Sequence, residues 1–317
     1  MSTTDKISIK EVIVAVIVLA LFGGAIMYTL SQLKAESGRK VVDISQQGDA
    51  QASHIETHVK LVSIDPIKGD LSARFEFEPS DNLMAEDGGL KEDLKLFVNS
   101  ANGKQEIDFP KGKIMSPVES TFNMHGGQAT EYPFDKYVAD IDLYIVKPPV
   151  KKPAAPTAGE PKKDGEETPA KEEKKADDDD DNELALSVDF TGSISGYDIQ
   201  AAKAKYSEVD FVGIETNIER SGTVQFVSIF VSVLTWLLTI GVLLLVISLL
   251  VRGRKVEIAM LSFMGAMLFG FYAIRNSQPN IPPIGVYSDF MSYIWCEVII
   301  GACLAACLIA WVLRPSK

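Results

Sequence analysis

The chain has 317 residues, 46% of them hydrophobic, and a formal net charge of −12 at pH 7. About a third of it lies in apolar stretches too long and too uniform for globular cores, so one soluble domain and a membrane part are expected. A nucleic-acid surface needs clustered Lys and Arg, which an excess of carboxylates opposes. Nucleic acid is therefore not an expected partner.

The first apolar stretch runs from Val12 to about Leu33 and follows Lys6 and Lys10. It could be a signal peptide or a retained anchor. It is longer than the usual signal core of about 7–15 residues, and no small-x-small cleavage site follows it cleanly. We therefore predict that residues 1–33 form a cytoplasmic tail and a transmembrane anchor helix.

Three later apolar stretches are each long enough to cross about 30 Å of hydrocarbon. They are Val224–Val251, Val256–Ile274 and Phe290–Leu313. We predict that residues 223–317 form a three-helix transmembrane domain with an outer loop over residues 275–289. The whole chain then has four transmembrane helices in a 1+3 arrangement.

Positive charges predict how these helices are oriented. The turn Arg252–Lys255 and the end Arg314–Lys317 are basic, and short basic segments stay in the cytoplasm. Four crossings place the N-terminus on the same side and residues 34–222 outside. The sequence thus predicts a multi-pass protein of the cell (inner or plasma) membrane, with both termini cytoplasmic and an extracytoplasmic, periplasmic-type domain.

In the expected outer domain, apolar residues alternate with polar ones, which is typical of half-buried strands. Asn102-Gly103 favours a tight hairpin between two of the strands. About seven or eight strands would form an all-β antiparallel sandwich. The predicted strands are His58–Ile64, Leu71–Glu78, Leu94–Val98, Gln105–Phe109, Val138–Val146, Leu184–Phe190 and Asp210–Glu219.

A segment over residues 147–182 interrupts this domain and consists almost wholly of Pro, Ala, Lys, Glu and Asp. It has too little apolar surface to offset the entropy of ordering, so a disordered loop is predicted. Its run Asp177–Asp181 could capture divalent cations weakly. A solvated charge run is favoured because the run has no turn-forming glycine to fix ligand oxygens.

No cofactor, metal site or catalytic site is predicted. His54 and His58 share a face if the chain is extended, but the third histidine, His125, is remote in sequence. The chain contains no H-E-x-x-H motif and no P-loop, and Gly192–Gly196 fails the nucleophile-elbow pattern because its central residue is Ile194. All three cysteines lie in the last apolar stretch, so the outer domain cannot form a disulfide.

Two motifs resemble a bacterial membrane protein family, domain of unknown function 4436, whose plan of one helix, a β domain and three helices covers nearly the whole chain. The first motif is Glu131–Tyr137; its Pro-Phe-Asp turn also occurs in pentameric ligand-gated channels, which however place four spans after the β domain. The second is Arg275–Gly285, followed by Asp289. The resemblance implies no activity. Within these motifs the candidate interaction residues are Tyr132, Pro133, Phe134, Asp135, Tyr137, Arg275, Gln278, Pro279, Pro282, Pro283, Gly285 and Asp289.

Each motif has a physical interpretation. Pro133 fixes the backbone of a turn, Phe134 can plug the sandwich or its membrane-facing base, and Asp135 can accept hydrogen bonds from backbone or Arg groups. The loop Gln278–Gly285 carries three prolines. It could be a firm ledge for the β domain or a docking site for another protein.

Glu297 lies about two turns inside the last span, where a carboxylate needs a partner or water. We expect it to pair with Arg275 or to bond a Ser or Tyr hydroxyl. A proton or ion path is the functional alternative, although one carboxylate is little for a relay.

These observations leave three hypotheses open. The first is a non-enzymatic accessory or scaffolding subunit of a membrane or envelope complex, with the lipid bilayer and other proteins, or further copies of itself, as partners. The second is a small transporter or channel component with Glu297 on a path between protomers. The third is a ligand sensor, which would need a pocket and a cytoplasmic output module.

Overall fold

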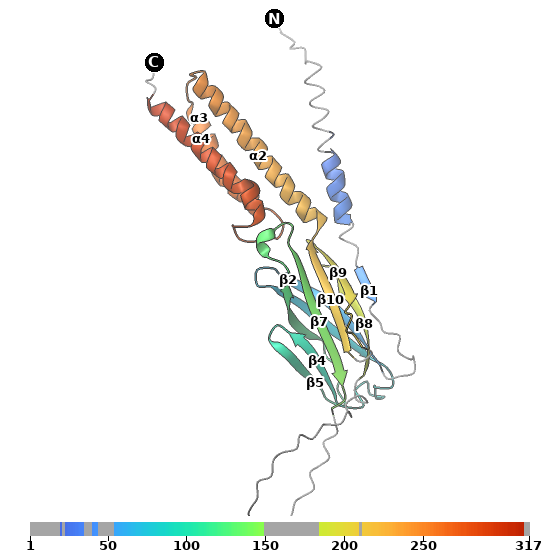
Figure 1. The fold of residues 1–317 in the computed structure, drawn as a ribbon. Helices are drawn as coiled ribbons and strands as arrows, with labels where there is room; N and C mark the ends of the chain where they lie inside the picture. Colours follow the sequence, from blue (N-terminus) through green and yellow to red (C-terminus); the bar gives the residue numbers. More distant parts are fainter. Residues whose placement is uncertain are drawn as a thin grey trace, which may run out of the picture.

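A computed structural model describes residues 20, 23–34, 40–43, 54–148, 184–208 and 211–313. Figure 1 shows an elongated molecule with a β domain at one end and a group of long helices at the other. Most of the predicted disordered segment, with Asp177–Asp181, lies outside the described residues, as do Lys6, Lys10 and Arg314–Lys317.

The β domain contains ten described strands, rather than the seven or eight predicted. They are β1 (Lys40–Asp43), β2 (His54–Asp65), β3 (Asp70–Pro79), β4 (Leu94–Ser100), β5 (Gly103–Phe109), β6 (Val118–His125), β7 (Lys136–Val146), β8 (Ala185–Gly192), β9 (Tyr197–Lys203) and β10 (Phe211–Arg220). Strands β1, β6 and β9 were not predicted. Strand β6 has only three apolar side chains in eight, and the alternation in β9 extends only from Tyr197 to Ala201, so both signals are short or weak.

Two facing layers share the strands. The first has the order β1-β8-β2-β3-β6, and the second has β9-β10-β7-β4-β5. Strand β6 joins the layers, because it pairs with β3 along most of its length and with β7 at Met124 and His125. The Asn102-Gly103 hairpin is present, with Ser100 opposite Gly103.

The prediction of a purely antiparallel sandwich is wrong, because β2 and β8 run parallel over seven residue pairs. Parallel neighbours need a long connection, and most of the domain lies between these two strands in the chain. The alternation of apolar and polar residues indicates which face of a strand is buried but not the direction of its neighbour. Because one parallel pair lies among antiparallel ones, the sheet is mixed.

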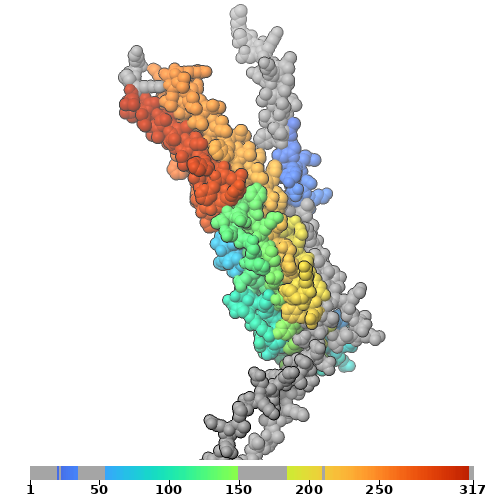
Figure 2. Space-filling model, in the orientation of Figure 1, coloured from blue at the N-terminus to red at the C-terminus, as the bar shows by residue number. Residues whose placement is uncertain are grey.

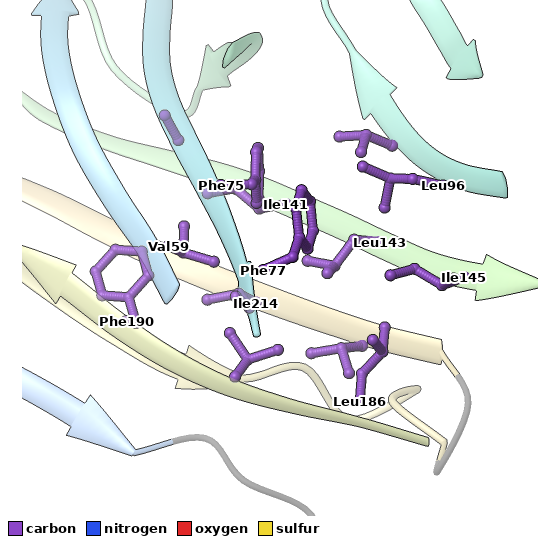
Figure 3. Packing of buried hydrophobic residues seen from close by; sticks show 14 of the residues in the cluster. Val59, Phe75, Phe77, Leu96, Ile141, Leu143, Ile145, Leu186, Phe190 and Ile214 are labelled. Carbon is purple, nitrogen blue, oxygen red and sulfur yellow. The ribbon is translucent and has the colours of Figure 1, made fainter. Parts of the chain in front are cut away.

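The core lies between the two layers. Figure 3 shows Val59, Phe75 and Phe190 of one layer facing Ile141 and Ile214 of the other, and all five are at most 2% exposed. Strand β7 illustrates the cause, since every second side chain from Tyr137 to Ile145 is buried. Burial of apolar area at about 25 cal/mol per Å² is what holds the layers together.

Three helices are long and apolar enough to cross a membrane: α2 (Gly222–Val251), α3 (Ile258–Asn276) and Asp289–Leu313. The last begins with the π-helical turn η2 (Asp289–Tyr293) and continues as α4 (Ile294–Leu313). Residues 23–34 are also helical and lie beside the start of α2, where the Tyr28 and Phe226 rings are 5.1 Å apart (Figure 1). The rest of the predicted first span lies outside the described residues, so the 1+3 arrangement stays a prediction.

Candidate functional site

The two predicted motifs come together where the β domain meets the helices. Strand β10 ends at Arg220, and α2 begins at Gly222 with only Ser221 between them. The Ser221 hydroxyl accepts a hydrogen bond from the backbone N–H of Val224, which caps the helix. Figure 2 shows the segment before β7, drawn in green, lying directly against this helical end of the molecule.

A buried ion pair lies at the centre of this junction. The Arg220 Nε donates to both carboxylate oxygens of Asp135 at 3.0 Å, and neither side chain is exposed. The Tyr137 hydroxyl donates to Asp135 Oδ2 at 2.9 Å. The expectation that Asp135 accepts a hydrogen bond from an arginine is therefore correct, and the arginine is Arg220.

Two tyrosine rings enclose the Arg220 guanidinium. Its central carbon lies 5.0 Å from the Tyr132 ring centroid and 4.6 Å from that of Tyr197, within reach of a cation–π attraction. Burial raises the pKa of Tyr132 and of Tyr197 to about 12, although the positive charge of Arg220 opposes the shift. Burial, with the Asp135 charge beside it, also raises the pKa of Tyr137. The cluster therefore keeps its phenols neutral around a compensated charge.

The proline-containing loop between α3 and η2 closes this cluster from the membrane side. The Tyr132 hydroxyl donates to the Pro279 carbonyl at 3.1 Å, and Arg220 Nη1 donates to the Asn280 carbonyl at 3.2 Å. The Asn280 side chain donates in turn to the Ser195 carbonyl at 3.2 Å. Its backbone φ of 51° is a left-handed conformation that Asn tolerates better than most residues. The loop is thus bonded to the β domain at several points, as expected of a ledge.

A second buried ion pair holds the loop in shape. Arg275 forms two parallel bonds of 2.8 Å with the two oxygens of Asp289, and its Nη2 also donates to the Pro282 carbonyl. Asp289 Oδ2 accepts further bonds from the backbone N–H groups of Gly285 and Val286. Two-pronged bonds of this kind fix geometry as well as charge.

The expected pairing of Glu297 with Arg275 is wrong. Arg275 lies in the last turn of α3, where it forms its ion pair with Asp289, two turns before Glu297 in the chain. Glu297 Oε1 is buried and has no hydrogen-bond partner in the part of the chain that the structure describes. The alternative expectation of a bond to a Ser or Tyr hydroxyl is therefore also wrong for this oxygen.

Phe134 does not plug the sandwich. Its side chain is 41% exposed and meets the Tyr287 ring edge-on, with the ring centroids 6.3 Å apart. Tyr132 takes the buried place instead, at 0% exposure. Phe134 and Tyr287, with the exposed Ile284 and Phe290, form an apolar rim at the level where the helices leave the β domain. Such aromatic rims suit the boundary between membrane and water.

The remaining predicted residues divide between buried and exposed positions. Gln278 and Pro282 are buried, whereas Pro283 and Gly285 are exposed, and Gly285 has a positive φ of 120°. Pro133 follows a cis peptide bond at Tyr132. The sequence interpretation missed Arg220, Tyr197 and Asn280. A single arginine at the last position before a membrane span was the available signal for Arg220, since a charge there needs a partner.

The arrangement fastens two parts of the molecule together. The two charges of each ion pair neutralise one another, and the Tyr132 and Tyr137 hydroxyls and the Pro279 and Pro282 carbonyls form hydrogen bonds around them. A cavity of about 600 Å³ opens beside Arg220, between the β2–β3 turn and the loop near Asn280.

A family model for a domain of unknown function, DUF4436, matches residues 45–218. The chain belongs to this family. The predicted membership of this family is confirmed over residues 45–218. A second model, for the domain of unknown function DUF8686, matches residues 220–314. A comparison with curated proteins found no match.

The two family matches meet at the junction. Asp135 and Tyr132 lie in the DUF4436 match, and their partners Arg220 and Pro279 lie in the DUF8686 match. The second predicted motif, from Arg275 to Gly285, belongs to the DUF8686 part rather than to DUF4436. The buried contacts thus connect the two matched parts of one chain.

Proposed function

We propose that this chain is a non-enzymatic accessory or scaffolding subunit, which holds its β domain at a fixed orientation on the outer surface of the cell membrane for a protein partner. The observation that carries the proposal is the buried junction built on Asp135 and Arg220. A domain that needs only anchoring can hang from a flexible linker. Here a single residue separates β10 from α2, and two buried ion pairs and a bonded loop hold the joint.

Orientation matters when one partner contacts both the β domain and the helices. The outward faces of α2, α3 and α4 carry large exposed apolar side chains, among them Leu237, Phe269 and Trp311. These faces suit lipid tails or the helices of another membrane protein. Because the joint is already fixed, a partner can contact the helices and the β domain at the same time without the entropic cost of ordering one part relative to the other.

The test is affinity purification of the tagged full-length chain from native membranes in mild detergent, with mass spectrometry of what accompanies it. The expected result is an unrelated membrane protein in stoichiometric amount. It should be retained by Lys136→Ala, which removes an exposed ion pair with Glu219, and lost from Asp135→Asn at equal membrane abundance. Recovery of the wild-type chain alone, or only with copies of itself, would overturn the proposal.

One observation favours a second function, a small transporter or channel component. The buried, unpartnered Oε1 of Glu297 lies within the last span, and ionisable groups there often mark a path for ions or protons. This function predicts a homo-oligomer whose flux in proteoliposomes is abolished by Glu297→Gln without loss of abundance or assembly. Equal flux in wild type and variant would exclude Glu297 from such a path.

A further inference from the structure

Four side chains that can bind a metal ion meet on the outer face of the first layer, far from the junction in the fold. They are Glu56 and His58 of β2, Glu78 of β3 and Asp189 of β8. Ligand atoms of Glu56, His58 and Asp189 all lie within 4.8 Å of one another. The imidazole Nδ1 is 3.5 Å from Asp189 Oδ2, and Nε2 is 3.7 Å from Glu78 Oε1.

Strand pairing brings these residues together. Along β2 the buried side chains alternate with outward ones, so Glu56 and His58 share the outer face. The parallel pairing sets Asp189 opposite His58, and the antiparallel pairing sets Glu78 opposite Glu56. His54 is on the same face, but four residues of strand separate it from His58 by about 13 Å, so the two histidines cannot share one ion. The pair suggested by sequence spacing is thus replaced by a set that crosses three strands.

The imidazole has a carboxylate at each ring nitrogen. A neutral imidazole carries a proton on only one nitrogen, so the other nitrogen directs a lone pair toward a carboxylate oxygen. Three carboxylates close together also repel one another. Two cations flank this group on the same face: Lys60, two residues along β2 from His58, and Arg74, whose guanidinium nitrogens lie 3.0 Å from a Glu76 oxygen and 3.8 Å from a Glu119 oxygen. A cation among the four groups would relieve both the repulsion and the lone-pair conflict.

We propose that Glu56, Asp189 and the Nδ1 of His58 bind a divalent transition-metal ion such as Zn²⁺, while Glu78 faces the Nε2–H on the other edge of the imidazole ring and orients it. One imidazole with carboxylates suits Zn²⁺ or Mn²⁺ better than Ca²⁺ or Mg²⁺, which prefer oxygen ligands alone. Zinc holds nitrogen and oxygen ligands at about 2.0–2.2 Å, so these partly exposed side chains must close in by small rotations. The ion would tie β8 to β2, two strands that are far apart in sequence. The proposed metal site does not depend on the scaffolding function.

The test uses the full-length protein in detergent, stripped with a chelator and titrated with Zn²⁺ by calorimetry. We expect one saturable site per chain and a higher unfolding temperature with zinc. His58→Ala and Asp189→Asn should each weaken binding at least tenfold while circular dichroism stays unchanged. His125→Ala is the matched control, because His125 is also exposed and lies 3.9 Å from a carboxylate of Asp140.

Two results would overturn the proposal. One is the absence of saturable zinc binding at neutral pH. The other is zinc binding that His58→Ala and Asp189→Asn leave unchanged, which would place the ion elsewhere, for instance on Asp177–Asp181.

Discussion

Arg220 joins the β domain to the membrane part through its charge, its planar shape and its donors. Asp135 neutralises the charge, Tyr132 and Tyr197 cover the two faces, and the Asn280 carbonyl takes one of the donors. Nη2 has no hydrogen-bond partner among the described residues. A lysine could not replace Arg220, because an ammonium group lacks the planar guanidinium that stacks on aromatic rings while it donates several hydrogen bonds.

Removing the partner of Arg220 should destabilise the protein strongly. Asp135→Asn leaves a buried guanidinium uncompensated, and loss of one member of a buried pair costs about 3–5 kcal/mol. Lys136→Ala should cost at most about 1 kcal/mol, since its pair with Glu219 is exposed. The measurement is chemical unfolding in detergent followed by circular dichroism.

The double change Asp135→Leu with Arg220→Met serves as a control, because it removes both charges. The double change should lower the free energy of unfolding by less than the summed effects of Asp135→Leu alone and Arg220→Met alone. If Asp135→Asn and Lys136→Ala cost the same, the ion pair does not hold the junction.

The buried tyrosines predict a loss of stability at alkaline pH. In the unfolded chain a phenol ionises near pH 10, whereas the pKa of Tyr132 and Tyr197 in the folded protein is about 12. Between these values the unfolded chain releases protons that the folded chain keeps. The free energy of unfolding should therefore be unaffected below about pH 10 and fall as the pH rises toward 12. Tyr197→Phe should reduce the slope in this window, and an unchanged slope would contradict the assignment.

At the scale of elements, the junction depends on how β6 turns into β7. The chain passes from His125 through Gly126 and Gly127 to the short helix η1 (Ala129–Glu131) and then to Asp135. A Cβ at Gly127 would overlap the Lys136 carbonyl oxygen, so only glycine lets the two segments approach this closely. The glycine thus helps to place Asp135 opposite Arg220.

Gly127→Ala should destabilise the β domain by about 1–3 kcal/mol, the usual cost of forcing atoms into a packed site. Gly265→Ala, in α3, is the control, because a Cβ there meets nothing within 4 Å. The comparison is thermal unfolding of both variants in the same detergent. A neutral Gly127→Ala would show that the backbone can shift at this corner without loss.

At the scale of the whole molecule, the polar junction separates a β domain from a bundle of apolar helices (Figure 1). The turn between α2 and α3 carries Arg252, Arg254 and Lys255 at the opposite end of the helices from the β domain. The positive-inside rule then predicts that this turn faces the cytoplasm and the β domain faces out.

Labelling with a membrane-impermeant maleimide tests this orientation. In a chain whose three native cysteines are replaced by alanine, Asn102→Cys in the β4–β5 turn should react in intact spheroplasts. Arg254→Cys should react only after the membrane is permeabilised. The reverse pattern would place the β domain in the cytoplasm and remove the basis of the proposed function.

The sequence by itself determined the three long helices, most of the strands and the family, because these depend on local apolar periodicity and on short motifs. It also singled out Asp135 as a hydrogen-bond acceptor and the loop Gln278–Gly285 as a support for the β domain, without placing the two together. Only the tertiary structure decided the partners: Arg220 rather than backbone for Asp135, and Asp289 rather than Glu297 for Arg275. The parallel β2–β8 pairing and the cluster around His58 were likewise decided by the fold. The physical reason is that pairing between distant segments follows strand direction, register and helix position, which no local pattern of side chains encodes.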